Sequence, residues 1–198
     1  KATELFTLSK QEANTKPFYG LVDDADAVFM SGGNQCFLID AFSGTEVYAA
    51  LLRLLDRGGV IGGSSAGAQV QSSFMTRGDY TKRAILGDRK HQIGFGFVKH
   101  AAFDVHVEER SREDDLFQLF RAKPKQLQDK GLDPLELLGI GIDQGTSIIV
   151  TGNRFLVTGP NKVYIFNPWK WVEALSIWGL LFCSTAFLRV PSSHNQPL

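Results

Sequence analysis

Short runs of apolar residues alternate along the chain with segments whose apolar residues recur at helical spacing. Residues 27–30 and 60–62 form apolar runs that predict buried strands. Between them, Thr45 is a suitable N-cap for a helix that would extend to about residue 57, where two glycines would end it. One face of this expected helix carries the apolar residues Val47, Leu51, Leu54 and Leu55.

The same alternation continues through the rest of the chain. A helix is expected after the turn over residues 63–67, ending near Ser73, and residues 74–97 are expected to form a loop region rich in Gly, Arg and Lys. Alternating strands and helices over the first two thirds of the chain predict an α/β fold with a mostly parallel sheet. The other predicted elements are strands over 101–107, 138–143, 147–150, 154–158 and 163–166, and a helix over 113–130 that bends near Pro124.

The composition is typical of one globular domain. The 198 residues include 21 Lys and Arg and 21 Asp and Glu, so the formal net charge is zero, and 43% of the residues are hydrophobic. Balanced charge argues against binding to nucleic acid through bulk electrostatics. Two cysteines cannot form a disulfide framework, and no His, Cys and acidic residues show the spacing of metal ligands. We therefore expect no metal, no cofactor and no nucleic-acid partner.

The two ends of the chain are less informative. No signal segment begins the chain, which favours the cytoplasm, but Lys1 is not an initiator methionine and the compartment stays open. Residues 174–188 form an uncharged apolar run that is shorter than the roughly 20 residues of a membrane span. We expect a buried helix or strand pair there, with Trp178 and Phe182 against the sheet, and no membrane partner. A membrane-seeking tail and a tail foreign to the fold are the alternatives.

A candidate nucleophile lies between a predicted strand and a predicted helix. Residues 63–67 match the pattern G-x-S-x-G, in which a sharp turn exposes the central serine at the carboxyl end of a strand. Ser65 would be that serine, and the backbone N–H of Ala66 could then bind an oxyanion. Ser64 is the nearest rival, but it lies one residue before the centre of the turn. The alternative is a Gly/Ser turn without chemistry.

A candidate base follows the strand predicted over residues 101–107. On a strand, Asp104 and His106 would point to the same face. Arg110 and Arg112 follow, and their guanidinium groups could bind a carboxylate. The alternative is a half-buried strand histidine followed by a solvated, charged helix start.

Four segments together resemble the cyanophycinase and peptidase E group, the serine peptidases of family S51. They are the glycine turn over 29–35, the elbow over 63–68, the D-x-H segment with its two arginines, and the G-I-G-I-D-Q sequence over 139–144. The resemblance implies a class I glutamine-amidotransferase-like α/β fold, a three-layer sandwich with a nucleophile elbow. Residues 1–168 would form this domain without the family's first strands, and residues 169–198 would be an atypical apolar segment and tail.

The resemblance also implies an activity, the hydrolysis of small acidic or β-aspartyl peptides by a serine nucleophile. Cyanophycinases cut β-linked Asp-Arg units, and peptidase E cuts dipeptides that begin with Asp. A small peptide would be the substrate or ligand, and a homodimer is left open. By the family motifs, Ser65 is the nucleophile and His106 the general base. The oxyanion positions are Gly33 and Ala66, and the substrate-pocket positions are Gln35, Asp104, Arg110 and Arg112.

Two departures from the family pattern bear on activity. Gln144 occupies the position of the glutamate that orients the histidine, and Asp115 occupies that of a third arginine. An amide in place of the acid of a Ser-His-Asp triad costs about 10⁴ in turnover. The alternative function is therefore a catalytically impaired relative that binds peptide or amino-acid ligands without turnover.

Overall fold

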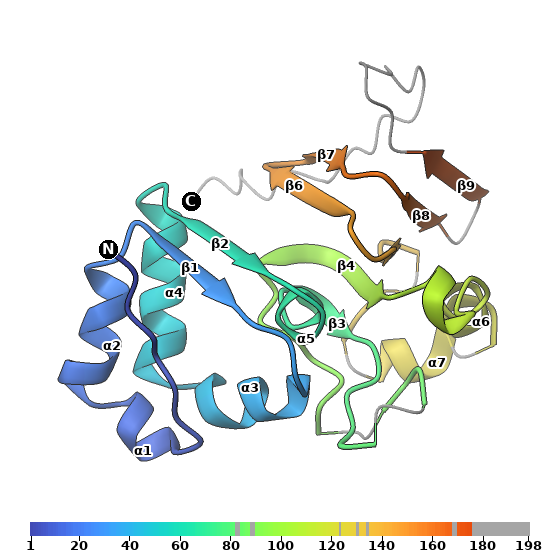
Figure 1. The fold of residues 1–198 in the computed structure, drawn as a ribbon. Coiled ribbons are helices and arrows are strands. Elements are labelled where there is room, and N and C mark those ends of the chain that lie inside the picture. Colours follow the sequence, from blue (N-terminus) through green and yellow to red (C-terminus); the bar gives the residue numbers. More distant parts are fainter. Residues whose placement is uncertain are drawn as a thin grey trace, which may run out of the picture.

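The computed structural model describes residues 1–81, 84–87, 90–122, 124–129, 131–133, 135–167 and 170–175 (Figure 1). Its helices are α1 (Lys10–Ala13), α2 (Lys16–Asp23), α3 (Gln35–Phe42), α4 (Glu46–Asp56), α5 (Ala66–Gln69), the 3₁₀ helix η1 (Glu108–Arg110), α6 (Asp115–Ala122) and α7 (Pro124–Gln128). Its strands are β1 (Ala27–Met30), β2 (Val60–Gly63), β3 (Ser72–Met75), β4 (Val98–Val105), β5 (Leu138–Ile142), β6 (Ser147–Thr151), β7 (Arg154–Thr158), β8 (Lys162–Asn167) and β9 (Lys170–Leu175).

Parallel strands form the centre of the fold. β1 pairs with β2, and β3, β4 and β5 form a second parallel block. β8 and β9 extend that second block in antiparallel order, while β6 and β7 form a hairpin. The expected α/β fold with a mostly parallel sheet is confirmed, and α5 packs against strands of both parallel blocks. The turn that begins α5 therefore lies where the two blocks meet.

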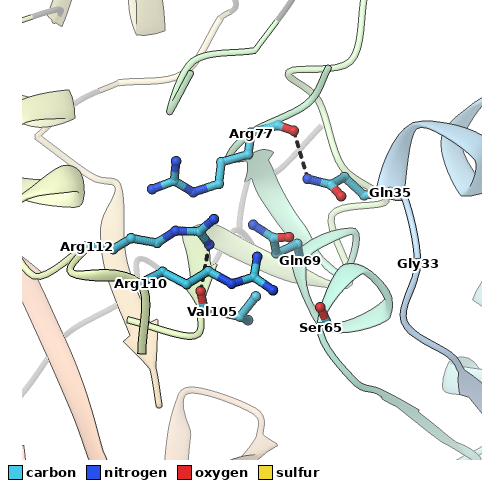
Figure 2. Close-up of a pocket in the computed structure, with 8 residues that line it drawn as sticks. All are labelled: Gly33, Gln35, Ser65, Gln69, Arg77, Val105, Arg110 and Arg112. Carbon is cyan, nitrogen blue, oxygen red and sulfur yellow. Dashed lines mark hydrogen bonds between the residues drawn. The ribbon is translucent and has the colours of Figure 1, made fainter. Parts of the chain in front are cut away.

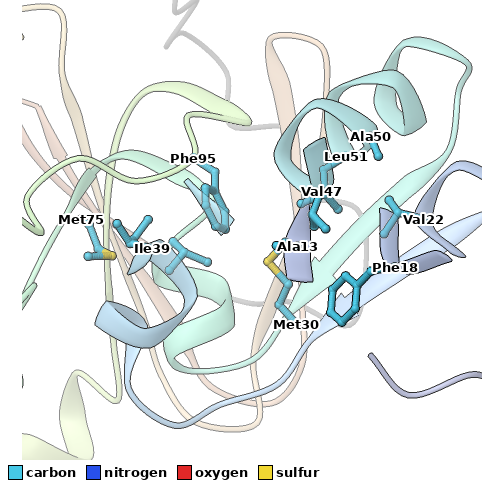
Figure 3. Packing of buried hydrophobic residues seen from close by; sticks show 11 residues of the cluster. Ala13, Phe18, Val22, Met30, Ile39, Val47, Ala50, Leu51, Met75 and Phe95 are labelled. Atoms are coloured by element: carbon cyan, nitrogen blue, oxygen red, sulfur yellow. The ribbon is translucent and has the colours of Figure 1, made fainter. Parts of the chain in front are cut away.

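The first hydrophobic core joins the N-terminal helices to β1 (Figure 3). α4 begins after Thr45, whose Oγ1 accepts a hydrogen bond from the Tyr48 N–H at 3.5 Å. The predicted apolar face of α4 lies inward, with Leu55 half-buried at its edge. This packing supports β1 and β2 from the side of the helices. The buried members of the core are Ala13, Phe18, Val22, Met30, Ile39, Val47, Ala50, Leu51, Val70, Met75 and Phe95.

Strand β4 separates two further cores, because successive strand residues point to opposite faces of a sheet. Ala102 packs in the core that includes Leu116 and Leu119 of α6. Ala101 and Phe103 pack on the other face, where residues of the β6–β7 hairpin contact the same core. Helices, sheet and hairpin thus form successive layers at this end of the molecule (Figure 1).

The structure differs from the sequence-based expectation just after the elbow. The helix expected to end near Ser73 ends at Gln69, and β3 follows at once. Ser72, Phe74 and Met75 are fully buried, and β3 pairs in parallel with β4. The strand forms because this short segment lies inside the fold. Helices α1, α2 and α3 were not expected either, whereas the helix break at Pro124 is confirmed.

The C-terminal segment contributes one strand to the second block. β9, which begins in the segment expected to be separate, pairs antiparallel with β8, so that Tyr164 faces Glu173 in the register. Trp178 and Phe182, expected to lie against the sheet, fall outside the described residues. Within the described part of the chain, no helix has the length and apolar character needed to cross a membrane.

The first core makes a testable prediction about stability. Leu51 is 1% exposed, so Leu51→Ala leaves a cavity between α4 and β1 and is expected to lower the free energy of unfolding by about 2–5 kcal/mol. The neighbouring Leu52 is 39% exposed, so Leu52→Ala is expected to change it by less than about 0.5 kcal/mol. Urea denaturation of both variants measures the difference. Equal losses would contradict the described packing of α4.

Candidate active site

Ser65 lies in a strained turn between β2 and α5. Its φ of 51° and ψ of −113° are unusual for a residue with a side chain, and such a conformation costs on the order of 1–3 kcal/mol. Close packing maintains the turn, because a Cβ on Gly67 would lie 2.1 Å from the Met30 carbonyl oxygen. Only glycine fits at that position. The local sequence thus brings β1 against the elbow and presents Ser65 at the end of β2.

His106 completes a dyad with this serine. The His106 Nε2 atom lies 2.9 Å from Ser65 Oγ, although the two residues are 41 positions apart in the sequence. His106 directly follows β4 and also has a positive φ, 56°. The alternation of side chains between the two faces of β4 therefore ends at Val105, and the imidazole of His106 lies against Ser65 instead of following that alternation. The sequence-predicted nucleophile and base are brought together.

The environment of His106 favours its neutral form. Burial, and next the positive charge of Arg110, lower the pKa of the imidazole below its ordinary value of 6.5. Glu109 and Asp104 act in the opposite direction, and Arg112 in the same direction as Arg110. A neutral imidazole can accept the proton of a serine hydroxyl. The dyad therefore has the protonation state that general-base catalysis requires at neutral pH.

A cavity of about 230 Å³ opens beside the serine (Figure 2). Figure 2 shows three arginine side chains and two glutamine side chains directed toward one space, with Ser65 at its border. A cavity of this size is below the usual range of 300–1,000 Å³ for small-molecule sites, which favours a small ligand. The lining residues are Gly33, Gln35, Ser65, Gln69, Arg77, Val105, Arg110 and Arg112.

Asp104 lies behind the cavity and does not line it. It is fully buried, and its carboxylate accepts hydrogen bonds from Arg77 Nε at 3.1 Å and Arg77 Nη2 at 3.0 Å. Arg112 Nη1 and Gln69 Nε2 each lie 3.4 Å from Asp104 Oδ1. Asp104 therefore fixes the side chains that line the cavity. Contact with a substrate, which the resemblance implied for Asp104, stays a prediction.

Asp115, at the first position of α6, is paired with an arginine. Arg77 Nη2 contacts both Asp104 and Asp115. Burial opposes the charge of Arg77, but these two carboxylates outweigh it and raise the pKa of the guanidinium. In Arg112, burial dominates and lowers the pKa, with Arg77 and Arg110 adding repulsion. At the position where the resemblance implied a third arginine, Asp115 is thus paired with an arginine from another part of the chain.

Arg110 provides the unpaired positive charge of the cavity. Arg77 and Arg112 share the two carboxylates of Asp104 and Asp115, which leaves one cation in excess among these five groups. Arg110 is exposed and lines the cavity, and no ion pair to it is formed within the described part of the chain. An incoming carboxylate could bind there without displacing an internal partner.

Gln35 adds an acceptor to the same cavity. Its Nε2 atom donates to the Arg77 carbonyl at 2.8 Å and to the Thr76 carbonyl at 3.3 Å, which fixes the amide plane. The Oε1 atom is buried and has no hydrogen-bond partner within the described chain. Such an atom costs free energy until a donor reaches it. A ligand with an N–H group at this point would satisfy it.

The oxyanion positions expected from the sequence are one residue that lines the cavity and the residue that follows Ser65. Gly33 lines the cavity and has a φ of 139°, a conformation that favours glycine. Ala66 begins α5, where the first backbone N–H groups of a helix have no acceptor within it. Their role as oxyanion donors stays a prediction.

Among the described residues, Gln144 forms no hydrogen bond with His106. Its side chain is exposed, and its backbone N–H donates to Glu109 Oε1 at 3.0 Å. Asp143, one residue earlier, is buried and accepts from the backbone N–H groups of Glu108 at 2.9 Å and Lys162 at 3.3 Å. Within the described residues, the Nδ1 atom of His106 has no hydrogen-bond partner. Gln144 therefore occupies the expected third position of the triad in the sequence, but its side chain forms no hydrogen bond with the Ser65–His106 dyad.

Sequence reasoning missed two polar residues of the site. Gln69 ends α5, one helical turn after Ser65, and its Nε2 donates to Thr76 Oγ1 at 2.7 Å. Arg77 lies in the region read as a loop, two residues after β3. The position of Gln69 in the turn after the serine was an available signal; nothing in the sequence near Arg77 indicates its partners. Within the described residues, no cluster of three His, Cys, Asp or Glu could bind a metal.

Comparison with known proteins identifies related chains. A curated cyanophycinase from Geminocystis herdmanii is 27% identical over 162 residues, which are 79% of this chain and 54% of that protein. This chain therefore spans about half the length of that curated relative. The crystal structure of a peptidase from an acI-B1 Actinobacterium is similar with a TM-score of 0.59 and 23% identity, over 85% of this chain and 64% of that chain. That similarity shows a shared fold.

A family model covers most of the chain. The model of peptidase family S51 matches residues 3–158, a stretch that includes the elbow, the histidine and the arginines of the cavity. The resemblance found in the four sequence segments is thereby confirmed. This chain belongs to peptidase family S51.

Proposed function

We propose that this protein is a serine-type peptidase that hydrolyses small acidic or β-aspartyl peptides. The observation that carries the proposal is the 2.9 Å contact between Ser65 Oγ and His106 Nε2 at the border of a cationic cavity. Burial lowers the pKa of this imidazole, which supports its role as a base. Family membership supports the same chemistry. The curated relative named cyanophycinase supports the choice of substrate class.

In the proposed reaction, Ser65 Oγ attacks the carbonyl carbon of the scissile amide and its proton passes to His106 Nε2. The carbonyl oxygen becomes an oxyanion beside the backbone N–H groups of Gly33 and Ala66. His106 then gives the proton to the leaving amine, and the C–N bond breaks. Water repeats the two steps on the acyl-enzyme, which releases the acid product and restores Ser65.

The proposed substrate carries both a carboxylate and an N–H donor close to the scissile bond. Arg110 would bind the carboxylate, since Arg77 and Arg112 are already paired with internal acids. The buried Oε1 of Gln35 would accept a hydrogen bond from the substrate's amino or amide N–H. The small cavity favours one or two residues over a long peptide.

A second candidate function is ligand binding without turnover. The exposed side chain of Gln144 and the Nδ1 atom of His106, unpartnered within the described residues, favour it, because an unoriented imidazole is a weak base. Calorimetry with β-Asp-Arg, followed by mass spectrometry of the ligand, separates the two functions. Recovery of the intact dipeptide after tight binding would favour the second.

Replacement of the nucleophile is expected to abolish hydrolysis. Ser65→Ala removes the attacking oxygen and should lower turnover on the order of 10⁶-fold. Mass spectrometry of products from β-Asp-Arg, β-Asp-Lys, α-Asp-Leu and neutral dipeptides measures it. The exposed neighbour is the matched control, and Ser64→Ala should leave turnover close to that of the unmodified protein. Wild-type turnover in a folded Ser65→Ala variant would contradict the proposal.

The pH profile is expected to reflect the lowered pKa of His106. Because the base must be neutral, kcat/KM falls as pH drops through this pKa, and the acidic limb should lie below pH 6.5. Steady-state rates on the best dipeptide, measured from about two pH units below to about two pH units above the ordinary histidine value, locate the limb. A limb above 6.5 would show that the imidazole is not in this environment.

Arg110 is expected to determine affinity for acidic ligands. Arg110→Ala removes the unpaired cation and should raise KM for acidic dipeptides by about 10- to 100-fold. It should also move the acidic limb to higher pH, because Arg110 lowers the pKa of His106. Arg154→Ala, an exposed arginine on β7, is the control and should change neither value. Unchanged affinity in Arg110→Ala would remove this residue from the substrate pocket.

A further inference from the structure

We propose that Glu109 is a positioning residue that supplies the carboxylate absent at Gln144 and accepts a hydrogen bond from the Nδ1–H of His106. The inference rests on the proposed function of the Ser65–His106 dyad. It assigns a role to a residue to which the family resemblance gave none. It also accounts for a dyad whose expected third member is an exposed amide.

Glu109 is bound at the position where the acid is expected. Its Oε1 accepts the backbone N–H of Gln144 at 3.0 Å, so the Glu109 carboxylate lies against the main chain of that residue. Asp143 makes the reciprocal contact, because its Oδ1 accepts the Glu108 N–H at 2.9 Å. These two hydrogen bonds join the end of β5 to η1, the helix that begins two residues after His106. The carboxylate is therefore held against the main chain of Gln144, on the short helix that begins two residues after His106.

Glu109 also has an oxygen available. Its Oε2 forms no hydrogen bond or ion pair with any described residue, and the side chain is exposed. Turning this oxygen toward the imidazole breaks at most one exposed hydrogen bond. The imidazole of His106 has a donor position available for this oxygen. Its Nε2 lies within hydrogen-bond distance of Ser65 Oγ, and its Nδ1 forms no hydrogen bond with any described residue.

The other charged groups around His106 cannot provide this carboxylate. Arg110 and Arg112 have the wrong sign, and Asp104 is occupied by Arg77, Arg112 and Gln69. Two carboxylates stabilise the positive form of the imidazole, and the influence of Glu109 is larger than that of Asp104. An imidazolium next to Arg110 needs such a counter-charge when it has taken the serine proton.

The test uses the complete chain and two readouts. Glu109→Gln keeps an oxygen that can accept the Gln144 N–H, so it removes the charge while leaving that contact. We expect the pKa of His106, followed by its NMR signal against pH, to fall by about one unit. Turnover of the best dipeptide should fall at least about 10-fold. The His106 signal is assigned by its loss in His106→Asn.

Two further variants make the test specific. Glu108→Gln is the matched control, because the backbone N–H of Glu108, and not its carboxylate, binds Asp143; it should leave both readouts unchanged. Gln144→Glu added to Glu109→Gln returns a carboxylate to the same place and should restore the pKa and the turnover.

The outcomes separate this inference from the proposed function. A His106 pKa that is equal in Glu109→Gln and the unmodified protein overturns the inference, whatever happens to turnover. A fall in turnover without a change in pKa also overturns it, since that result marks a structural role. The charge of Glu109 also acts on the imidazole through space, so support requires two changes limited to Glu109→Gln: the pKa shift and the loss of the His106 Nδ1–H proton signal in the NMR spectrum at low pH. Both changes support the inference even if no dipeptide is cleaved, and the absence of cleavage then counts against the peptidase alone. A pKa shift with the Nδ1–H signal unchanged overturns the inference.

Discussion

The buried carboxylate of Asp104 is the group on which the architecture of the site depends. An ion without solvent is costly unless charges and donors surround it, and here Arg77, Arg112 and Gln69 do so. These three residues come from the segment after β3, the segment after η1 and the end of α5. One fully buried side chain on β4 therefore fixes the wall of the cavity from three directions. The wall is preorganised because its arginines are oriented before any ligand arrives.

Of the five described residues other than glycine that have a positive φ, two are the members of the Ser65–His106 pair. Their φ values are 51° and 56°; Ser65 lies in the turn between β2 and α5, and His106 directly follows β4. Such conformations persist only where the surroundings determine them. The β1–β2 pairing and the contact of Gly67 with the Met30 carbonyl do so for Ser65, and the parallel β4–β5 ladder does so for His106. The 2.9 Å contact is thus a product of two independent backbone constraints.

Local patterns in the sequence predicted much of the fold and singled out the two residues, Ser65 and His106, that the structure brings together. The strands on either side of the elbow, helix α4 with its Thr45 cap, and the later hairpin each have a periodicity or a turn that is complete within a few residues. β3 could not be predicted in this way, because its burial arises from pairing with β4, 26 residues later at Ser72 and Val98. The role of Asp104 also depends on distant partners. Likewise, the G-I-G-I-D-Q sequence identified Gln144 as the third position of the triad, but it could not predict that this side chain is exposed.

The pairing of Arg77 with Asp115 has a consequence for how such a site can change over time. The two residues are 38 positions apart but share one electrostatic contact, and Arg77 is 5% exposed. Reversing either charge alone would leave a nearly buried ion facing its own sign, a change that costs several kcal/mol. A sequence in which the arginine moves from position 77 to position 115 must therefore first acquire an uncharged residue at one of them, or change both residues together. In related proteins, the charge at one position should be informative about the charge at the other.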